Sequence, residues 1–151
     1  MQKMLPRKLL AAAKHAYGRA YAPYSKFKVG AAILADDGKV YAGGNVENAA
    51  YPNGVCAETS AISAMVLGGA KKIRAIAVVA GGPKLVTPCG GCRQRIAEFA
   101  DPETLVHICG PDGLKTTFTI AELLPASFDK RNLREKKADL KPKRDRSKTA
   151  R

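Results

Sequence analysis

Three cysteines and one glutamate occur in two short motifs with the composition of a catalytic metal site. Residues 56–58 read CAE and residues 88–92 read PCGGC. Zn²⁺ binds thiolates well, and a catalytic zinc site uses three protein ligands, so that its fourth position stays open for water. The carboxylate of Glu58 is then free to carry protons. The spacing therefore predicts one Zn²⁺ held by Cys56, Cys89 and Cys92, with Glu58 as the catalytic residue.

Other uses of the four cysteines have to be weighed against this one. A single C-x-x-C pair also occurs in redox sites and in structural zinc knuckles. The chain lacks a charged-then-apolar leader and any apolar run of about 18 residues, which favours a soluble cytoplasmic protein with no membrane partner. Because disulfides persist mainly in oxidising compartments, we expect metal or catalytic use. Cys109, in an apolar segment, is expected to be a small buried core residue.

Both motifs are predicted to begin a helix after a loop that contains glycine or proline. The start of a helix has free N–H groups and a partial positive charge, which favour thiolate over thiol. Pro88 ends the preceding segment, and two glycines follow Cys89, which lets the backbone turn tightly enough for Cys89 and Cys92 to share one ion. Cys56 and Glu58 are two residues apart, so we expect one to point to the metal and the other to the reacting group.

The rest of the chain alternates between helical and strand patterns. The order predicts a mixed sheet with helices on its faces, which opens with a hairpin at an Asp-Gly turn. The expected elements are a helix at 6–17, strands at 28–35 and 40–45, a helix at 56–67, a strand at 73–80, a helix at 89–99, strands at 105–109 and 116–119, and a helix at 120–124.

Positive charge is concentrated at the C-terminal end. The chain of 151 residues has a net charge of +13, and residues 129–151 hold 11 Lys/Arg against 4 Asp/Glu, a net charge of +7. This stretch has few large apolar residues to offset the entropy of ordering. We expect a catalytic domain at 1–128 and a basic, flexible tail at 129–151. The tail could contact nucleic acid through phosphates, but it has no aromatic platform for specific readout.

Five blocks of sequence resemble the homotetrameric zinc-dependent cytidine deaminases. They follow the order and spacing of that family from residue 5 to about residue 133. The resemblance implies a three-layer α/β/α sandwich with a mixed five-stranded sheet and helices on both faces. It also implies a homotetramer with one Zn²⁺ per subunit and a pyrimidine nucleoside as substrate. The blocks are YSKFKVGAA at 24–32, GNVENAAYP at 44–52, VCAE at 55–58, TPCGGCRQ at 87–94 and LLPASF at 123–128.

The reaction implied by the resemblance is hydrolytic deamination of cytidine and deoxycytidine to uridine and deoxyuridine, with release of ammonia, as in pyrimidine salvage. Hydroxide on the zinc would attack C4, while Glu58 would carry protons to N3 and to the departing amine. Six residues would bind the substrate: Phe27 against the base, Asn45 and Glu47 at the ribose, the Ala57 backbone at the pyrimidine, and Tyr51 and Phe128 closing the pocket, partly from neighbouring subunits.

Residue types alone would give these positions other roles. Phe27 in an apolar strand pattern would be a core residue. Asn45 and Glu47 would be a solvated strand end, and Tyr51 the start of a rigid loop. Phe128 would anchor the tail. The surrounding motifs, rather than the residue types, favour substrate binding.

One position departs from the family pattern. Many relatives have arginine directly after the catalytic glutamate, where it donates hydrogen bonds to the thiolates on zinc, and this chain has Thr59. Three thiolates and one hydroxide around Zn²⁺ carry a net charge of −2, so the loss of donors should matter. We expect Arg93, the two helix starts and the hydroxyl of Thr59 or Ser60 to compensate.

Two other functions remain alternatives. The first is a deaminase of another aminopyrimidine or of a nucleic-acid base. It is disfavoured because Asn45 and Glu47 suit a free ribose, and because nucleic-acid and deoxycytidylate deaminases usually have His where this chain has Cys56. The second is a non-catalytic zinc module with Cys109 as fourth ligand, which would leave Glu58 without a role.

Overall fold

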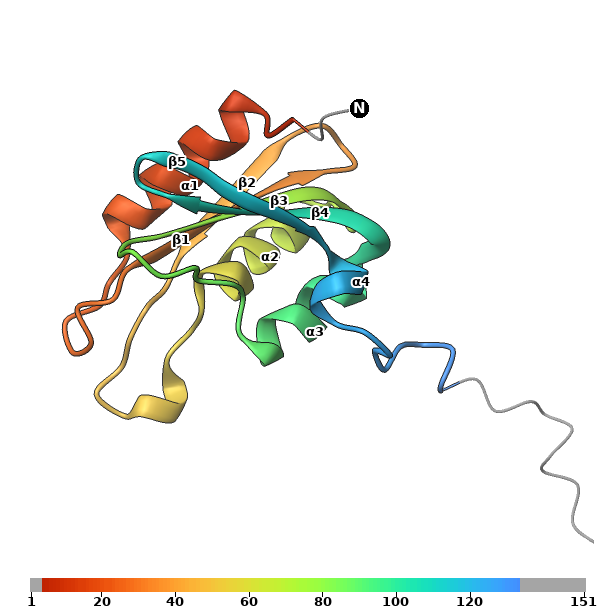
Figure 1. Ribbon diagram of the computed structural model, residues 1–151. Helices are drawn as coiled ribbons and strands as arrows, with labels where there is room; N and C mark the ends of the chain where they lie inside the picture. The colour runs from red at the N-terminus through yellow and green to blue at the C-terminus, as the bar shows by residue number, and fades with distance from the viewer. Residues whose placement is uncertain (1–3, 134–151) are drawn as a thin grey trace, which may run out of the picture.

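A mixed sheet of five strands forms the middle layer of the computed structural model, which describes residues 4–133 (Figure 1). Only β3 and β4 pair in parallel, and the other neighbouring strands are antiparallel. This confirms the mixed five-stranded sheet. From one edge to the other the strands are β2 (Val40–Gly44), β1 (Val29–Ala35), β3 (Ile73–Ala80), β4 (Ala100–Gly110) and β5 (Gly113–Thr119).

Helices cover both faces of the sheet, which confirms the three-layer sandwich (Figure 1). Successive side chains of a strand point to opposite faces, so the buried strands contribute to two separate cores. On one face, α1 (Arg7–Arg19) packs its buried Leu9 and Ala13 against alternate residues of β1 and β3. The opposite core contains residues of the other three α-helices of the described chain, which are α2 (Ala57–Leu67), α3 (Gly90–Phe99) and α4 (Ile120–Leu123).

The crossover connections bring the starts of α2 and α3 to the same edge of the sheet. β2 and β3 each run antiparallel to β1, so they are parallel to each other, and α2 connects them. In the same way, α3 connects the parallel strands β3 and β4. Each helix therefore begins beyond the carboxyl end of a strand. This is the edge at which open α/β sheets bind their ligands.

The boundaries of several elements differ from those expected. The hairpin is present, with Leu34 paired to Val40 around Gly38, whose φ of +77° suits glycine. The fourth strand starts at Ala100, five residues earlier than predicted. The register with β3 shifts there, because Ile73 pairs with Ala100 and Ala75 with Leu105, which leaves an irregular segment that has no apolar strand pattern.

Two further predictions concern the ends of the chain and the membrane. Within the described residues, no helix is long and apolar enough to cross a membrane. The division into a domain at 1–128 and a tail at 129–151 stays a prediction. Residues 129–133 form a turn in which Arg131 pairs with Asp129, and the remainder of the expected tail lies outside the described residues.

Candidate active site

Two helix starts supply the three cysteines. Cys56 is the N-cap residue of α2 and Cys89 is the N-cap residue of α3. Neither side chain makes a capping hydrogen bond within the described chain, so both sulfurs are available to a ligand. Cys92 lies on the first turn of α3 and is fully buried. The predicted placement of both motifs at helix starts is therefore confirmed.

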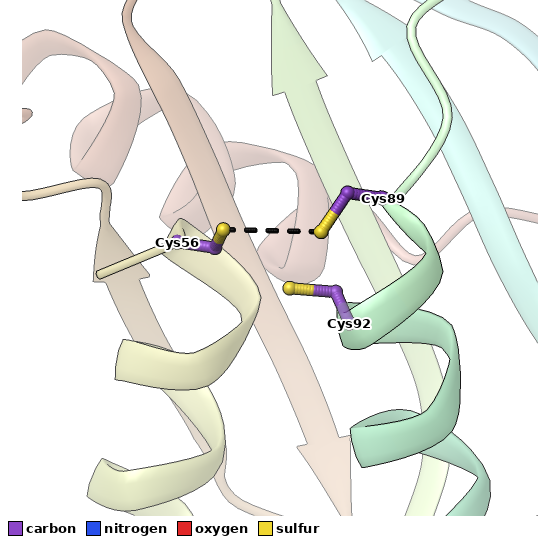
Figure 2. Close-up of side chains that lie close together, drawn as sticks. All are labelled: Cys56, Cys89 and Cys92. Atoms are coloured by element: carbon purple, nitrogen blue, oxygen red, sulfur yellow. Dashed lines mark hydrogen bonds between the residues drawn. The ribbon is translucent and has the colours of Figure 1, made fainter. Parts of the chain in front are cut away.

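The three sulfur atoms converge at a spacing that suits one metal ion. They all lie within 4.8 Å of one another, and the Sγ atoms of Cys56 and Cys89 are 4.0 Å apart. Figure 2 shows Cys56 pointing from α2 towards the two cysteines of α3. A tetrahedral zinc ion with Zn–S bonds of about 2.3 Å requires sulfurs about 3.8 Å apart. The cysteine triad, which we define as Cys56, Cys89 and Cys92, therefore fits zinc.

The surroundings of the triad act differently on its three thiols. Burial raises the pKa of the Cys56 and Cys92 thiols above the ordinary value, and the charges of neighbouring acidic groups add to the effect. Burial opposes ionisation of Cys89 as well, but hydrogen bonds from its neighbours outweigh it and lower the pKa of that thiol. The protein alone therefore does not stabilise three thiolates at neutral pH, whereas a bound metal ion would deprotonate them.

Cys109 does not belong to this site. It is buried in β4 and packs in the core under α1, on the face of the sheet opposite to α2 and α3. The metal-binding group found among residues 4–133 contains only the triad. The prediction of a small buried core residue is confirmed, and the described structure provides no fourth cysteine ligand.

Glu58 is the second residue of α2 and is only 4% exposed. Its side chain lines the same pocket as Cys56 and Cys89. Burial raises the pKa of its carboxyl group. A raised carboxyl pKa brings proton uptake closer to neutral pH, which suits a group that both accepts and donates protons.

A pocket of about 370 Å³ opens beside the triad, within the size range of small-molecule sites. Besides Cys56 and Cys89, six predicted site residues line this pocket, although they come from widely separated parts of the sequence. The apolar wall contributed by Val29 and Val78 of the strands and by Val86 of the loop before α3 was not predicted, because an apolar residue has the same sequence pattern whether it faces a pocket or the core. The six are Phe27, Asn45, Glu47, Tyr51, Ala57 and Glu58.

Asn45 and Glu47 also hold the loop that carries Phe27. The amide of Asn45 accepts from the N–H of Val29 (2.8 Å) and donates to the carbonyl of Phe27 (2.9 Å). The carboxylate of Glu47 accepts from the backbone N–H groups of Tyr24 and Ser25 at 3.2 and 3.1 Å. Partial desolvation raises the pKa of Glu47, but these donors outweigh it, so that its pKa is lowered.

Phe128 lies apart from this pocket in the chain. It is 59% exposed, and its carbonyl accepts a hydrogen bond of 2.8 Å from the side chain of Gln94. Tyr51 is at the mouth of the pocket, where it is 78% exposed and lies 6.3 Å from the ring of Tyr24. The predicted pocket residues are thus brought together except for Phe128.

Arg93 and Thr59 occupy different surroundings. The guanidinium of Arg93 donates to the carbonyls of Pro88 (2.8 Å) and Leu123 (2.9 Å) and to the hydroxyl of Thr87 (2.8 Å). The hydroxyl of Thr59 lies 3.7 Å from the Sγ atom of Cys92. Arg93 therefore connects the loop before Cys89 to the end of α4 by hydrogen bonds, whereas Thr59 contacts a cysteine of the triad.

Known proteins share both the sequence and the fold of this site. The cytidine deaminase of Sporosarcina psychrophila is 47% identical over 126 residues, which are 83% of this chain and 93% of that relative. The cytidine deaminase of Mycobacterium tuberculosis H37Rv is 41% identical over 117 residues, 77% of this chain and 84% of that relative. The crystal structure of cytidine deaminase from Burkholderia pseudomallei has a TM-score of 0.77 and 42% identity, over 83% of this chain and all of that one.

A family model covers most of the described chain. It is named the cytidine and deoxycytidylate deaminase zinc-binding region and matches residues 4–108, which include the whole cysteine triad and Glu58. With the two relatives and the solved structure, this match shows that the chain belongs to the zinc-dependent cytidine deaminase family.

Proposed function

We propose that this protein is a zinc-dependent cytidine deaminase that hydrolyses cytidine and deoxycytidine to uridine and deoxyuridine, with release of ammonia. The observation that carries the proposal is the placement of Glu58 beside the cysteine triad in one pocket. The triad supplies three ligands rather than four, which leaves a coordination position for water. The two relatives described above are both named cytidine deaminase.

The residues of the pocket divide the reaction between them. The triad holds Zn²⁺, which when bound acts as a Lewis acid and makes water a nucleophile at neutral pH. Glu58 would accept one proton from the attacking water and pass it to N3 of the pyrimidine. It would then take the remaining proton of the hydroxyl group added at C4 and give it to the amine, so that the C4–N bond breaks, ammonia leaves and a carbonyl forms at C4. One carboxylate serves as base and acid because the steps occur in sequence.

Four residues are proposed to bind the nucleoside. Phe27 packs against the base, and the backbone of Ala57 contacts the pyrimidine edge. Asn45 and Glu47 hydrogen-bond the ribose. Both already bind the backbone of the Phe27 loop, so ribose and base are recognised by one connected unit.

A homotetramer is proposed as the active assembly, with Tyr51 and Phe128 completing pockets of neighbouring subunits. Two observations support an assembly. Exposed aromatic side chains surround the mouth of the pocket, and Phe128 is exposed and lies outside the pocket of its own chain. Exposed apolar groups that gather at one place are typical of interaction surfaces.

The cellular role is proposed to be pyrimidine salvage in the cytoplasm. A site built from three reduced cysteines suits a reducing compartment. We propose that residues 1–128 form the catalytic domain and that residues 129–151 are a solubilising tail. Any contact of this tail with nucleic acid would depend on charge and would be weakened by salt.

The decisive experiment compares the zinc-loaded full-length wild type with Glu58→Gln. We expect the wild type to consume cytidine and deoxycytidine with stoichiometric ammonia release. The variant should lose about 10²–10⁴-fold in kcat because it has no proton carrier. Its zinc content should stay at one per chain, since Glu58 is not a ligand. If the wild type contained one Zn²⁺ per chain and still deaminated neither nucleoside, the proposal would be disproved.

The same assay separates the alternative substrates. Free cytosine, deoxycytidylate and a cytosine-containing DNA oligonucleotide are tested beside the nucleosides. Turnover of the oligonucleotide above that of cytidine would favour a nucleic-acid deaminase instead. A Glu58→Gln variant with full activity would contradict the assigned mechanism but not the substrate.

A further inference from the structure

We propose that Thr59 is the positioning residue for the zinc-binding sulfur of Cys92, to which its hydroxyl donates a hydrogen bond, and that Arg93 does not serve this purpose. The inference rests on the zinc site of the proposed function and adds to it a residue that acts through a ligand. Sulfur ligands of zinc are commonly supported by outer donors, and such donors affect both metal affinity and activity.

Thr59 and Cys92 face each other from equivalent positions of two helices. Each is the third residue of its helix, three positions after an N-cap cysteine. The Oγ1 atom of Thr59 is 3.7 Å from the Sγ atom of Cys92, which is within hydrogen-bonding reach because sulfur is larger than oxygen. A zinc-bound sulfur has lost its proton and can only accept. The hydroxyl of Thr59 must therefore be the donor.

The hydroxyl of Thr59 is also free for this purpose. Serine and threonine within helices often turn their hydroxyl back to a carbonyl of the preceding turn. Ser63, one turn later on α2, does so and donates to the carbonyl of Thr59 at 2.9 Å. Thr59 itself makes no such bond in the described chain, and its hydroxyl contacts the Cys92 sulfur instead.

Arg93 directs its hydrogen bonds to oxygen atoms away from the triad. Its Nε, Nη1 and Nη2 atoms each donate to an oxygen, at 2.8, 2.9 and 2.8 Å, and it makes no hydrogen bond to sulfur within residues 4–133. The acceptors are in the loop before Cys89 and at the end of α4. Arg93 therefore shapes the loop, while the only side-chain hydroxyl in hydrogen-bonding contact with the described triad belongs to Thr59.

The test removes the hydroxyl and measures zinc binding without substrate. Thr59→Val keeps the β-branched shape but has no donor, and Thr59→Ser restores a hydroxyl. Ser63→Ala removes a hydroxyl from the same helix without touching the triad. Each variant is titrated with a chelator that competes for Zn²⁺. Each is also loaded with Co²⁺ to record the sulfur-to-metal charge-transfer band, which reports the electron density on the thiolates.

We expect Thr59→Val to bind Zn²⁺ about 10–100-fold more weakly and to shift the Co²⁺ band, with Thr59→Ser close to wild type and Ser63→Ala unchanged. A Thr59→Val protein with wild-type zinc affinity and an unshifted band would overturn the inference. A loss that Thr59→Ser does not rescue would overturn it too, because the hydroxyl would then not be the cause. These measurements need no turnover. A wild type that binds zinc but deaminates no nucleoside would therefore refute the proposed function alone.

Discussion

The starts of α2 and α3 are built on one plan but carry different chemistry. Each has a cysteine as N-cap, and each places a residue of the site three positions later. On α3 that residue is Cys92, after two glycines, so this helix serves the metal alone. On α2 it is Thr59, after Glu58, so this helix supplies one ligand, the proton carrier and a donor. Because α2 supplies only one of the three metal ligands, the other side chains at its start can serve catalysis.

The two helices are also held in place differently. α2 packs closely on β2 at Gly43, where a Cβ atom would lie 2.5 Å from the backbone nitrogen of Ala61. α3 is connected to its surroundings by the side chains of Arg93 and Gln94, which bind the flanking loop and the C-terminal segment. Both helices pack on the same core, which includes the buried Ile96 of α3. The close contact at Gly43 and the hydrogen bonds of Arg93 can still be disturbed separately.

The largest effects are expected where the two helices are alike. Cys56→Ser and Cys89→Ser should each weaken zinc binding by more than the roughly 10–100-fold expected when the hydroxyl of Thr59 is removed. Neither variant should have activity. Serine is a better helix cap than cysteine, so the helices themselves should survive. Zinc content and circular dichroism check this. Cys109→Ala is the matched control and should keep its zinc, and a similar loss of zinc in that variant would contradict the assigned ligand set.

The next effect concerns the packing of α2. Gly43→Ala should lower the free energy of unfolding by about 1–3 kcal/mol or more, because backbone atoms of α2 would have to move. Urea unfolding measures the change. Gly18→Ala, with no atom within 4 Å of the added Cβ, is the control and should not destabilise. Equal stability of the Gly43 and Gly18 variants would show that α2 is not packed as closely as described.

The smallest effect is expected at the contacts of α3. Arg93→Lys keeps the charge but cannot reach three acceptors at once, so the free energy of unfolding should fall by about 1–2 kcal/mol. Its zinc affinity should change less than that of Thr59→Val. If Arg93→Lys kept full stability and lost more zinc affinity than Thr59→Val, Arg93 would serve the metal rather than the loop. Unfolding curves and chelator titrations of the same samples decide between the two.

Much of the site could be predicted because its chemistry is encoded locally. The C-x-E and P-C-x-x-C motifs indicate ligands and a carboxylate, and the glycine- and proline-containing loops before them indicate helix starts. The early start of β4 could not be predicted, because residues 101–104 are irregular and have no strand pattern. The hydrogen-bond partners of Arg93 could not be predicted either. An arginine next to a metal ligand in the sequence can bind the ligand sulfur or a distant carbonyl, and the local sequence is the same in both cases.

The sequence by itself determined the kinds of groups in the site, the alternation of strands and helices, and the family. Only the tertiary structure decided which of these groups meet. Cys56 and Cys89 are 33 residues apart and come within 4.0 Å because two crossover helices start at the same edge of the sheet. The contact between Thr59 and Cys92 and the anchoring of Arg93 depend on the same packing. Local sequence sets the reach of each side chain, but the distance between two helices depends on the strands that they connect.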